Sequence, residues 1–313
     1  MPMRFVTIVV AIALAVPACT AGREGPTEPA EAGDLDVDDA VRAAGARWAA
    51  RAFVEAYAGA PADDGAGLRP LVGTPLLRRW AGWLQVQNEG FPGAIAGDVD
   101  AVRIGPAVPF EVESVPGSAE ILREVDVRAS ITFAFEPRDG DPFSVTRSLD
   151  GPMRLIRGSE GDWSVLDFTR DSVPLSSQFE AVSDAGDRDA GVTVAIAAFF
   201  AAPTWQFGLV VQTAGPLSLG SDDVTLVDDD GGLVATAGAI TTQLERIRAG
   251  ATVRGLVAFE PRSSADGLFL RLAVRGSRGR STLVIPLAGR IHPIEVTGGT
   301  GAESPTPSPS QVG

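Results

Sequence analysis

The feature that most constrains the fold is a change in hydrophobic period about a third of the way along the chain. In the first part, apolar residues recur every three or four positions, which is typical of helices that bury one face. Over 120–135 they alternate with polar residues instead, which predicts a half-buried strand. The apolar members of this alternation are Val125, Val127, Ala129, Ile131, Phe133 and Phe135.

Five further segments around this strand also favour a strand, and glycine or proline turns separate them. We therefore expect consecutive antiparallel strands that form one curved sheet. The predicted strands are 99–104, 110–115, 120–135, 143–149, 153–157 and 163–168.

Two helices are predicted before this sheet. Asp34 or Asp36 can cap the first helix, which ends near Gly59, and the second covers about 75–87. Helices followed by antiparallel strands indicate an α+β domain, which we place at 35–180. The predicted apolar faces are Val41, Ala44, Trp48, Ala49, Ala52, Phe53 and Ala56 on the first helix, and Leu76, Leu77, Trp80, Trp83 and Leu84 on the second.

The second half of the chain has an all-β pattern. A polar, charged stretch at 181–190 lacks periodicity and is predicted to be a linker. Beyond it, about seven short strand segments recur at intervals of about ten residues, which is typical of a two-sheet sandwich. We therefore expect a β-sandwich at 191–297 and a disordered Pro/Ser-rich tail at 298–313.

The N-terminal segment has the layout of a signal peptide, with an apolar run over 5–18 followed by Cys19. The run is about 14 residues long, whereas a transmembrane helix needs about 20, so a retained span is the weaker alternative. Val-Pro-Ala-Cys at 16–19 resembles the bacterial lipobox, in which the cysteine sulfur is lipidated. This resemblance implies a signal peptide at 1–18 and an acyl anchor such as palmitate on Cys19. The segment 19–34 has almost no apolar side chains to bury, which predicts a disordered, acidic tether. Ordinary secretion is an alternative.

The composition excludes several kinds of chemistry. Cys19 is the only cysteine and His292 the only histidine, which excludes an intrachain disulfide and any multi-histidine zinc site. The formal net charge of −14 disfavours nucleic acid as a partner, because phosphate backbones repel an acidic protein. We expect no metal and no cofactor.

The first domain resembles the nuclear-transport-factor-2-like cone, a fold shared with ketosteroid isomerase and polyketide cyclases. The likeness rests on the first helix around Trp48, Phe53 and Tyr57 and on the segments 151–157 and 161–168, the latter reading Gly-Asp-Trp-Ser-Val-Leu-Asp-Phe. It implies helices and a curved sheet that enclose a conical pocket. The candidate pocket residues are Trp48, Tyr57, Trp80, Trp83, Asp126 and Asp167.

An enzyme with this fold would need an acid–base pair inside the cone. The first domain contains no histidine, which leaves Asp126, Asp167, Glu111 and Tyr57 as candidates. Asp126 alternates onto the polar face of its strand, and Asp167 is expected to hold a turn or pair with an arginine. We therefore expect no catalysis, while a ligand-binding cone and a filled structural cone stay open as alternatives.

The second domain resembles the immunoglobulin-like extracellular modules of Gram-positive lipoproteins. The likeness rests on 224–232, which contains an Asp-Gly hairpin turn, and on 247–261, which ends in Phe-Glu-Pro. Near its end lies a basic cluster of Arg275, Arg278 and Arg280. These arginines could bind anionic groups of an envelope polymer, or they could simply balance nearby acids in a hairpin.

The sequence therefore predicts an α+β cone followed by an all-β immunoglobulin-like sandwich. The expected function is that of a lipid-anchored, extracytoplasmic binding or interaction protein of the cell envelope, without enzymatic activity. Its expected partners are the membrane, through lipid on Cys19, and an envelope protein or polymer. The first alternative is a carrier of a hydrophobic small molecule in the cone, and the second is an isomerase or cyclase.

Overall fold

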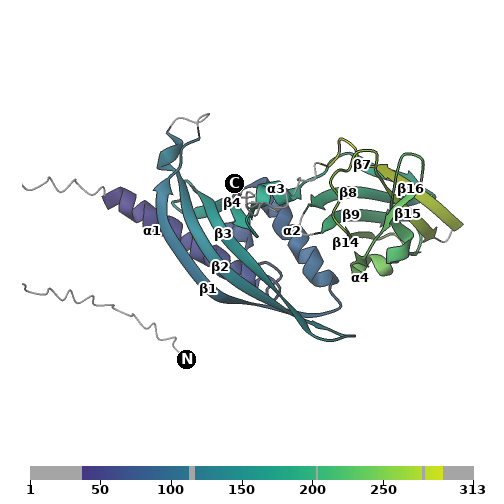
Figure 1. The fold of residues 1–313 in the computed structure, drawn as a ribbon, viewed down its shortest axis with the longest axis horizontal. Helices are drawn as coiled ribbons and strands as arrows, with labels where there is room; N and C mark the ends of the chain where they lie inside the picture. Colours follow the sequence, from purple (N-terminus) through teal and green to yellow (C-terminus); the bar gives the residue numbers. More distant parts are fainter. Residues whose placement is uncertain (1–36, 113–116, 202–203, 277–278, 292–313) are drawn as a thin grey trace, which may run out of the picture.

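The computed structural model describes residues 37–112, 117–201, 204–276 and 279–291. Of the described residues, 49% lie in strands and 22% in helices. The strands form three sheets whose neighbours pair antiparallel (Figure 1). The prediction of an α+β cone followed by an immunoglobulin-like sandwich is wrong, because the chain is mostly β and is built from several antiparallel sheets.

The first sheet is a meander in which each strand pairs with the next along the chain. Its first three strands are long and bend together (Figure 1). Phe133 on the second strand lies opposite Gly97 on the first and Val145 on the third. The strands are β1 (Gly93–Pro109), β2 (Leu122–Pro137), β3 (Phe143–Arg157), β4 (Trp163–Arg170) and β5 (Val173–Pro174).

Single strands cross two of the predicted breaks, β1 at 105–109 and β3 at 150–152. The predicted strands 143–149 and 153–157 are both part of β3, whereas β1 contains 99–104 and ends at Pro109, before the predicted strand 110–115. The two predicted breaks contain proline, which cannot donate to a strand ladder. Pro106 is accommodated because β1 is an edge strand and its register with β2 shifts between Ile104 and Ala107. Pro152 is accommodated because β4 begins to pair with β3 only at Met153. Underestimating strand length in this way is one reason why the predicted fold class is wrong.

Two long helices pack against this sheet, α1 (Val37–Gly59) and α2 (Pro75–Gly90). Thr74 caps α2, because its Oγ1 accepts a hydrogen bond of 3.1 Å from the amide of Leu77. Pro75 occupies the first turn, where no amide donor is needed. None of the helices in the described part of the chain is both long and apolar enough to span a bilayer. Short 3-10 turns lie at Arg69–Leu71 and Ser118–Glu120.

The second half contains two sheets that share one apolar core. One sheet has the order β13-β14-β9-β8-β6, with β7 also paired to β8, and the other has the order β10-β15-β11-β12, with β16 paired to β15. Their strands are β6 (Phe179–Glu180), β7 (Ala185–Asp189), β8 (Val192–Phe200), β9 (Trp205–Thr213), β10 (Leu217–Ser218), β11 (Val224–Val227), β12 (Leu233–Thr236), β13 (Ala239–Ile240), β14 (Thr252–Phe259), β15 (Phe269–Gly276) and β16 (Gly279–Pro286). One-turn helices are α3 (Leu175–Gln178) and α4 (Thr242–Glu245), with a 3-10 turn at Ser221–Asp223.

The two halves are not separated by an irregular linker. The stretch predicted to be a linker, 181–190, contains β7, which pairs with β8. The core of the first half also includes Ala198, Phe200 and Leu256 from the second half. The buried ring of Trp83 on α2 lies against Gly208 of β9, where a Cβ atom would come within 2.9 Å of it. Helix α2 therefore serves both halves and does not close a cone over the first sheet alone.

Candidate functional site

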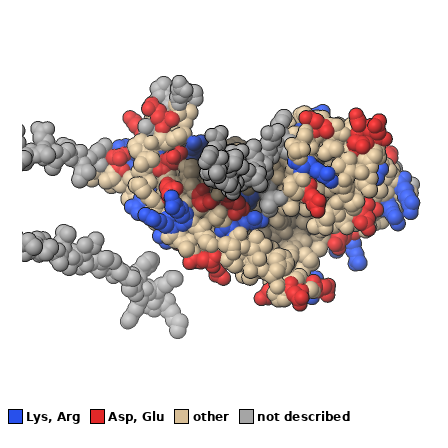
Figure 2. Space-filling view, viewed as in Figure 1, with Lys and Arg blue, Asp and Glu red and all other residues tan. Residues whose placement is uncertain are grey.

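A cavity of about 510 Å³ lies where the far end of the first sheet meets α2 and the second half. Figure 2 shows a hollow in the surface between the two halves. Its volume falls within the range of about 300–1,000 Å³ that is usual for small-molecule sites. The lining residues are Tyr57, Pro61, Leu84, Gln87, Asn88, Gly90, Phe91, Pro92, Ile95, Phe133, Phe135, Val145, Arg147, Arg170, Gln206, Ala239, Ile240, Thr241, Leu256 and Ala258.

The sheet wall of the cavity is aromatic towards the β2–β3 hairpin. Phe135 stacks on Phe143 with ring centroids 4.8 Å apart, and Phe91 packs edge-on against Phe135 at 5.2 Å. Phe133 lies one inward position further along β2, opposite Val145. These side chains share one face because inward positions alternate along a strand. The wall therefore offers a continuous apolar surface.

The opposite wall is formed where α2 ends against α4 and β14. Gly90 is the last residue of α2, so its carbonyl lacks an intrahelical donor, and Thr242 Oγ1 donates to it at 3.2 Å. Gln243 Nε2 donates to the carbonyl of Val86 at 3.1 Å. A side chain at position 90 would clash, because its Cβ would lie 2.5 Å from that of Thr241. These contacts fix α2 against the second half and shape the cavity.

Two arginines supply the charge of the cavity wall. Arg147 on β3 donates from Nη1 to Asp171 Oδ2 at 3.3 Å, and this carboxylate balances the positive charge of the arginine. Arg170 at the end of β4 is only 8% exposed and donates from Nε and Nη2 to Gln178 Oε1, at 3.1 and 2.6 Å. The sequence interpretation did not identify Arg147, Arg170 or Gln178.

Further polar groups at the cavity lack partners within the described part of the chain. Asn88 Nδ2 is buried without a hydrogen-bond partner. Tyr57, which is 3% exposed, has no side-chain hydrogen bond there either. No aspartate or glutamate is among the described lining residues. The arrangement suits a ligand that is mainly apolar and accepts hydrogen bonds.

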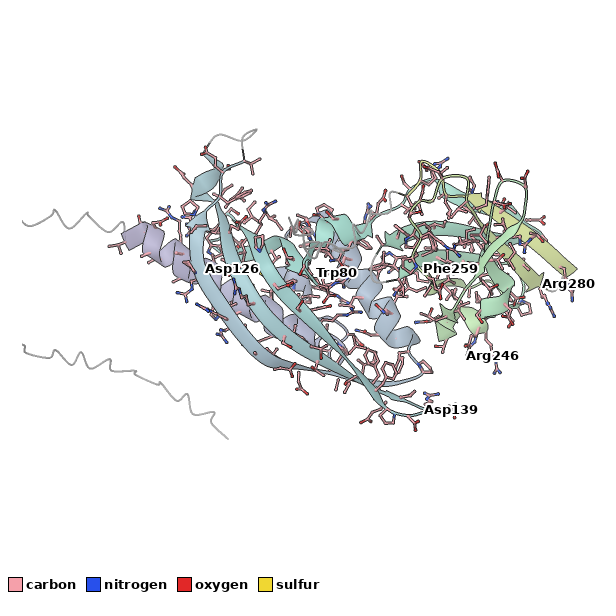
Figure 3. All side chains as sticks on the ribbon, viewed as in Figure 1. Trp80, Asp126, Asp139, Arg246, Phe259 and Arg280 are labelled. Carbon is pink, nitrogen blue, oxygen red and sulfur yellow. The ribbon has the colours of Figure 1, made fainter. Side chains whose placement is uncertain are left out.

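The aromatic residues predicted to line a conical pocket lie in different places in the structure. Tyr57 lines the cavity, but Trp80 is completely buried among Phe53, Tyr57 and Phe168, with Trp80–Phe168 ring centroids 5.3 Å apart. These rings contact one another between the helices and the sheet, where Figure 3 labels Trp80. Trp83 is also buried, as described above. Trp48 was predicted to belong to the buried face of the first helix, but it is 70% exposed on α1.

The two predicted pocket acids lie away from the cavity. Asp126 is exposed on the first sheet and lies 3.5 Å from Arg128 (Figure 3). Asp167 accepts hydrogen bonds from Ser176 Oγ at 2.6 Å, from the Ser176 amide at 3.1 Å and from the Phe168 amide at 3.0 Å. Asp167 therefore holds the connection between β4 and α3, which is one of the two roles predicted for it.

The predicted anion-binding arginines lie at the far end of the second half, where Figure 3 labels Arg280. Arg275 and Arg280 are exposed and face each other across β15 and β16. Neither forms an ion pair with any residue that the structure describes. Arg278 and Cys19 lie outside the described residues.

Comparison with known proteins adds no family. No protein-family model matches the chain, and no curated protein is significantly similar to it. Within the described ranges, no group of three or more His, Cys, Asp or Glu side chains is arranged to hold a metal ion. The chemistry of the site therefore has to be inferred from its own residues.

Proposed function

We propose that this protein binds a hydrophobic small molecule in the cavity between its two halves and acts as a carrier or capture protein. The observation that supports this proposal is the apolar volume of about 510 Å³, with few polar groups in its walls. An apolar ligand gains free energy by leaving water for such a surface, at about 25 cal/mol per Å² buried.

We further propose that the protein acts by binding and not by catalysis. General acid–base chemistry needs a titratable group that reaches the bound molecule. Of the four candidates from the sequence, Asp126 and Glu111 are exposed and do not line the cavity, and Asp167 accepts three hydrogen bonds near its own turn. Tyr57 does line the cavity, but no carboxylate or histidine is among the described lining residues to form an acid–base pair with it. The lipobox-like sequence ending at Cys19 supports a lipid anchor, so we propose that capture takes place at the extracytoplasmic face of the membrane.

Binding can be tested with the neutral fluorescent probe N-phenylnaphthylamine. The protein used is residues 19–313 with Cys19→Ala, which prevents lipidation and keeps the whole described fold. We expect saturable fluorescence enhancement. Ala258→Trp, which fills the cavity wall, should abolish it, whereas Ala273→Trp at an exposed position of β15 should not. An absence of saturable probe binding to the parent protein would refute the proposal.

A second candidate function is attachment to an acidic envelope polymer through the β15–β16 hairpin. Like charges directly opposite each other on neighbouring strands repel, and Arg275 faces Arg280 in this way. An anionic partner would relieve that repulsion. Replacing both arginines with glutamine should weaken sedimentation with anionic cell-wall polymer at low salt, whereas Arg246→Gln and Arg248→Gln should not. Equal sedimentation of both double variants would rule out this role.

A further inference from the structure

The guanidinium of Arg170 is held in place by a neutral group. Its partner Gln178 is 2% exposed, and Gln178 Nε2 donates to the carbonyls of Arg170 and Val173, at 2.7 Å each. The amide is therefore fixed at both ends, with its oxygen towards Arg170. It orients the arginine without compensating its charge.

Among the residues that the structure describes, none provides a counter-ion for the positive charge of Arg170 at the cavity. Within the described residues no carboxylate pairs with it, and its Nη1 forms no hydrogen bond. The second arginine of the wall, Arg147, is by contrast paired with Asp171. A buried charge without a partner is costly, so such a position favours the binding of an anion. The chain as a whole is acidic, with 40 acidic and 26 basic residues. The described lining of the cavity differs from this average, because it contains two arginines and no aspartate or glutamate.

The charge and the aromatic surface lie at different points along the same wall. On β3 the inward positions are Phe143, Val145 and Arg147, in that order from the hairpin. Arg147 therefore lies about 13 Å along β3 from Phe143. Arg170 lies at the Arg147 end of the wall, because the amide of the next residue, Asp171, donates to the carbonyl of Ser148 at 2.9 Å. A ligand that satisfies both ends is therefore elongated, apolar over most of its length and charged at one end.

From these observations we infer that the ligand is a single-chain amphiphile with an oxyanion head group, a carboxylate or a phosphate ester. Its head group accepts hydrogen bonds from Arg170, since guanidinium groups match the geometry of such oxyanions. Its hydrocarbon chain lies against Phe91, Phe133 and Phe135, the phenylalanines that line the cavity. This inference rests on the proposed function, because it names the class of molecule that the same cavity binds.

The test compares three competitors of equal chain length for their ability to displace bound N-phenylnaphthylamine. Dodecanoate and dodecyl phosphate carry the oxyanion, and dodecanol does not; each is used below its micelle-forming concentration. A hydrogen bond to a charged group contributes enough to strengthen binding about tenfold or more. We therefore expect at least one of the two anions to displace the probe at about a tenth of the dodecanol concentration, and the more potent anion identifies the head group.

The role of Arg170 is tested by Arg170→Met, with Arg128→Met on the exposed part of the first sheet as the matched control. Arg170→Met should lose the preference for the anions, measured as the ratio of the dodecanol concentration to the anion concentration that displaces the probe, and Arg128→Met should keep that ratio. Equal potency of all three competitors on the parent protein would overturn the inference, even if Arg170→Met fails to fold. If the parent protein binds the probe but the three competitors are equally potent, the oxyanion head group is refuted and the proposed function is not. If the parent protein does not bind the probe, the proposed function itself is refuted.

Discussion

The guanidinium carbon of Arg254 on β14 lies 4.2 Å from the centroid of the Trp83 ring on α2. The Cη2 and Cζ2 atoms of this ring lie against Gly208 of β9, so Trp83 contacts the second half through two strands. Burial lowers the pKa of the Arg254 guanidinium, and the nearby carboxylate of Glu89 partly opposes this effect. The arginine keeps its charge at neutral pH and links the two halves through a cation–π contact.

Replacing Arg254 with alanine should reduce the free energy of unfolding by about 0.5–1 kcal/mol, the contribution of a cation–π contact at an exposed position. Urea denaturation followed by tryptophan fluorescence measures this change. Arg246→Ala, a change at an exposed residue of the same half, should have no measurable effect. If both variants unfold at the same urea concentration as the parent, the contact does not stabilise the fold.

Replacing Gly90 with alanine should destabilise the contact between α2 and α4. The added Cβ would come within 2.5 Å of Thr241 Cβ, and overpacking of this kind costs about 1–3 kcal/mol. Gly82→Ala is the control, because on the same helix the nearest atom to its Cβ would be 4.0 Å away. That change should stabilise the protein by up to about 1 kcal/mol, since alanine favours helix. Thermal unfolding should therefore shift in opposite directions for the two variants.

The buried Arg123 on β2 pairs with Asp39 in the first turn of α1. Asp39→Asn would remove the negative charge from this pair and should cost about 1–3 kcal/mol. The exposed pair of Arg51 and Glu55, 3.9 Å apart on the same helix, gives the comparison. Glu55→Gln should cost no more than about 0.5 kcal/mol. Similar losses in the two variants, measured by chemical denaturation, would contradict a structural role for Arg123.

The proposed lipid anchor can be tested by phase partitioning of the full-length protein expressed in a Gram-positive bacterial host. The protein should enter the detergent phase, because two or three acyl chains hold a protein firmly to lipid. Cys19→Ala should move it to the aqueous phase. Recovery of the parent protein in the aqueous phase would contradict lipidation.

The sequence predicts where strands occur better than how long they are or how they pair. Alternation correctly marks the buried face of β2, where Val125, Val127 and Ile131 are almost completely buried. Proline and glycine suggested breaks at 105–109 and 150–152 that the structure bridges with a register shift and a late start of pairing. These solutions depend on the neighbouring strand, so local pattern cannot reveal them.

The cavity was predictable only in part. The alternation of Phe143, Val145 and Arg147 places an arginine on the inward face of a predicted strand, and this signal was available in the sequence. Trp80 and Trp83 were assigned to a pocket, but an apolar helix face predicts burial and does not distinguish filled from open space. The hydrogen bonds between Arg170 and Gln178 form because the chain reverses direction through β5 and α3. Hydrophobic periodicity does not predict such a reversal.

The position of α2 has a consequence for how the protein unfolds. Because this helix buries one face on the first sheet and another on β9 and β14, separating the halves would expose Trp83 and leave the carbonyl of Gly90 without its donor. The halves therefore form a single cooperative unit, in which melting of one removes the packing surface of the other. A cavity between the halves persists only while the whole chain is folded, so partial proteolysis should abolish the proposed ligand binding together with the fold.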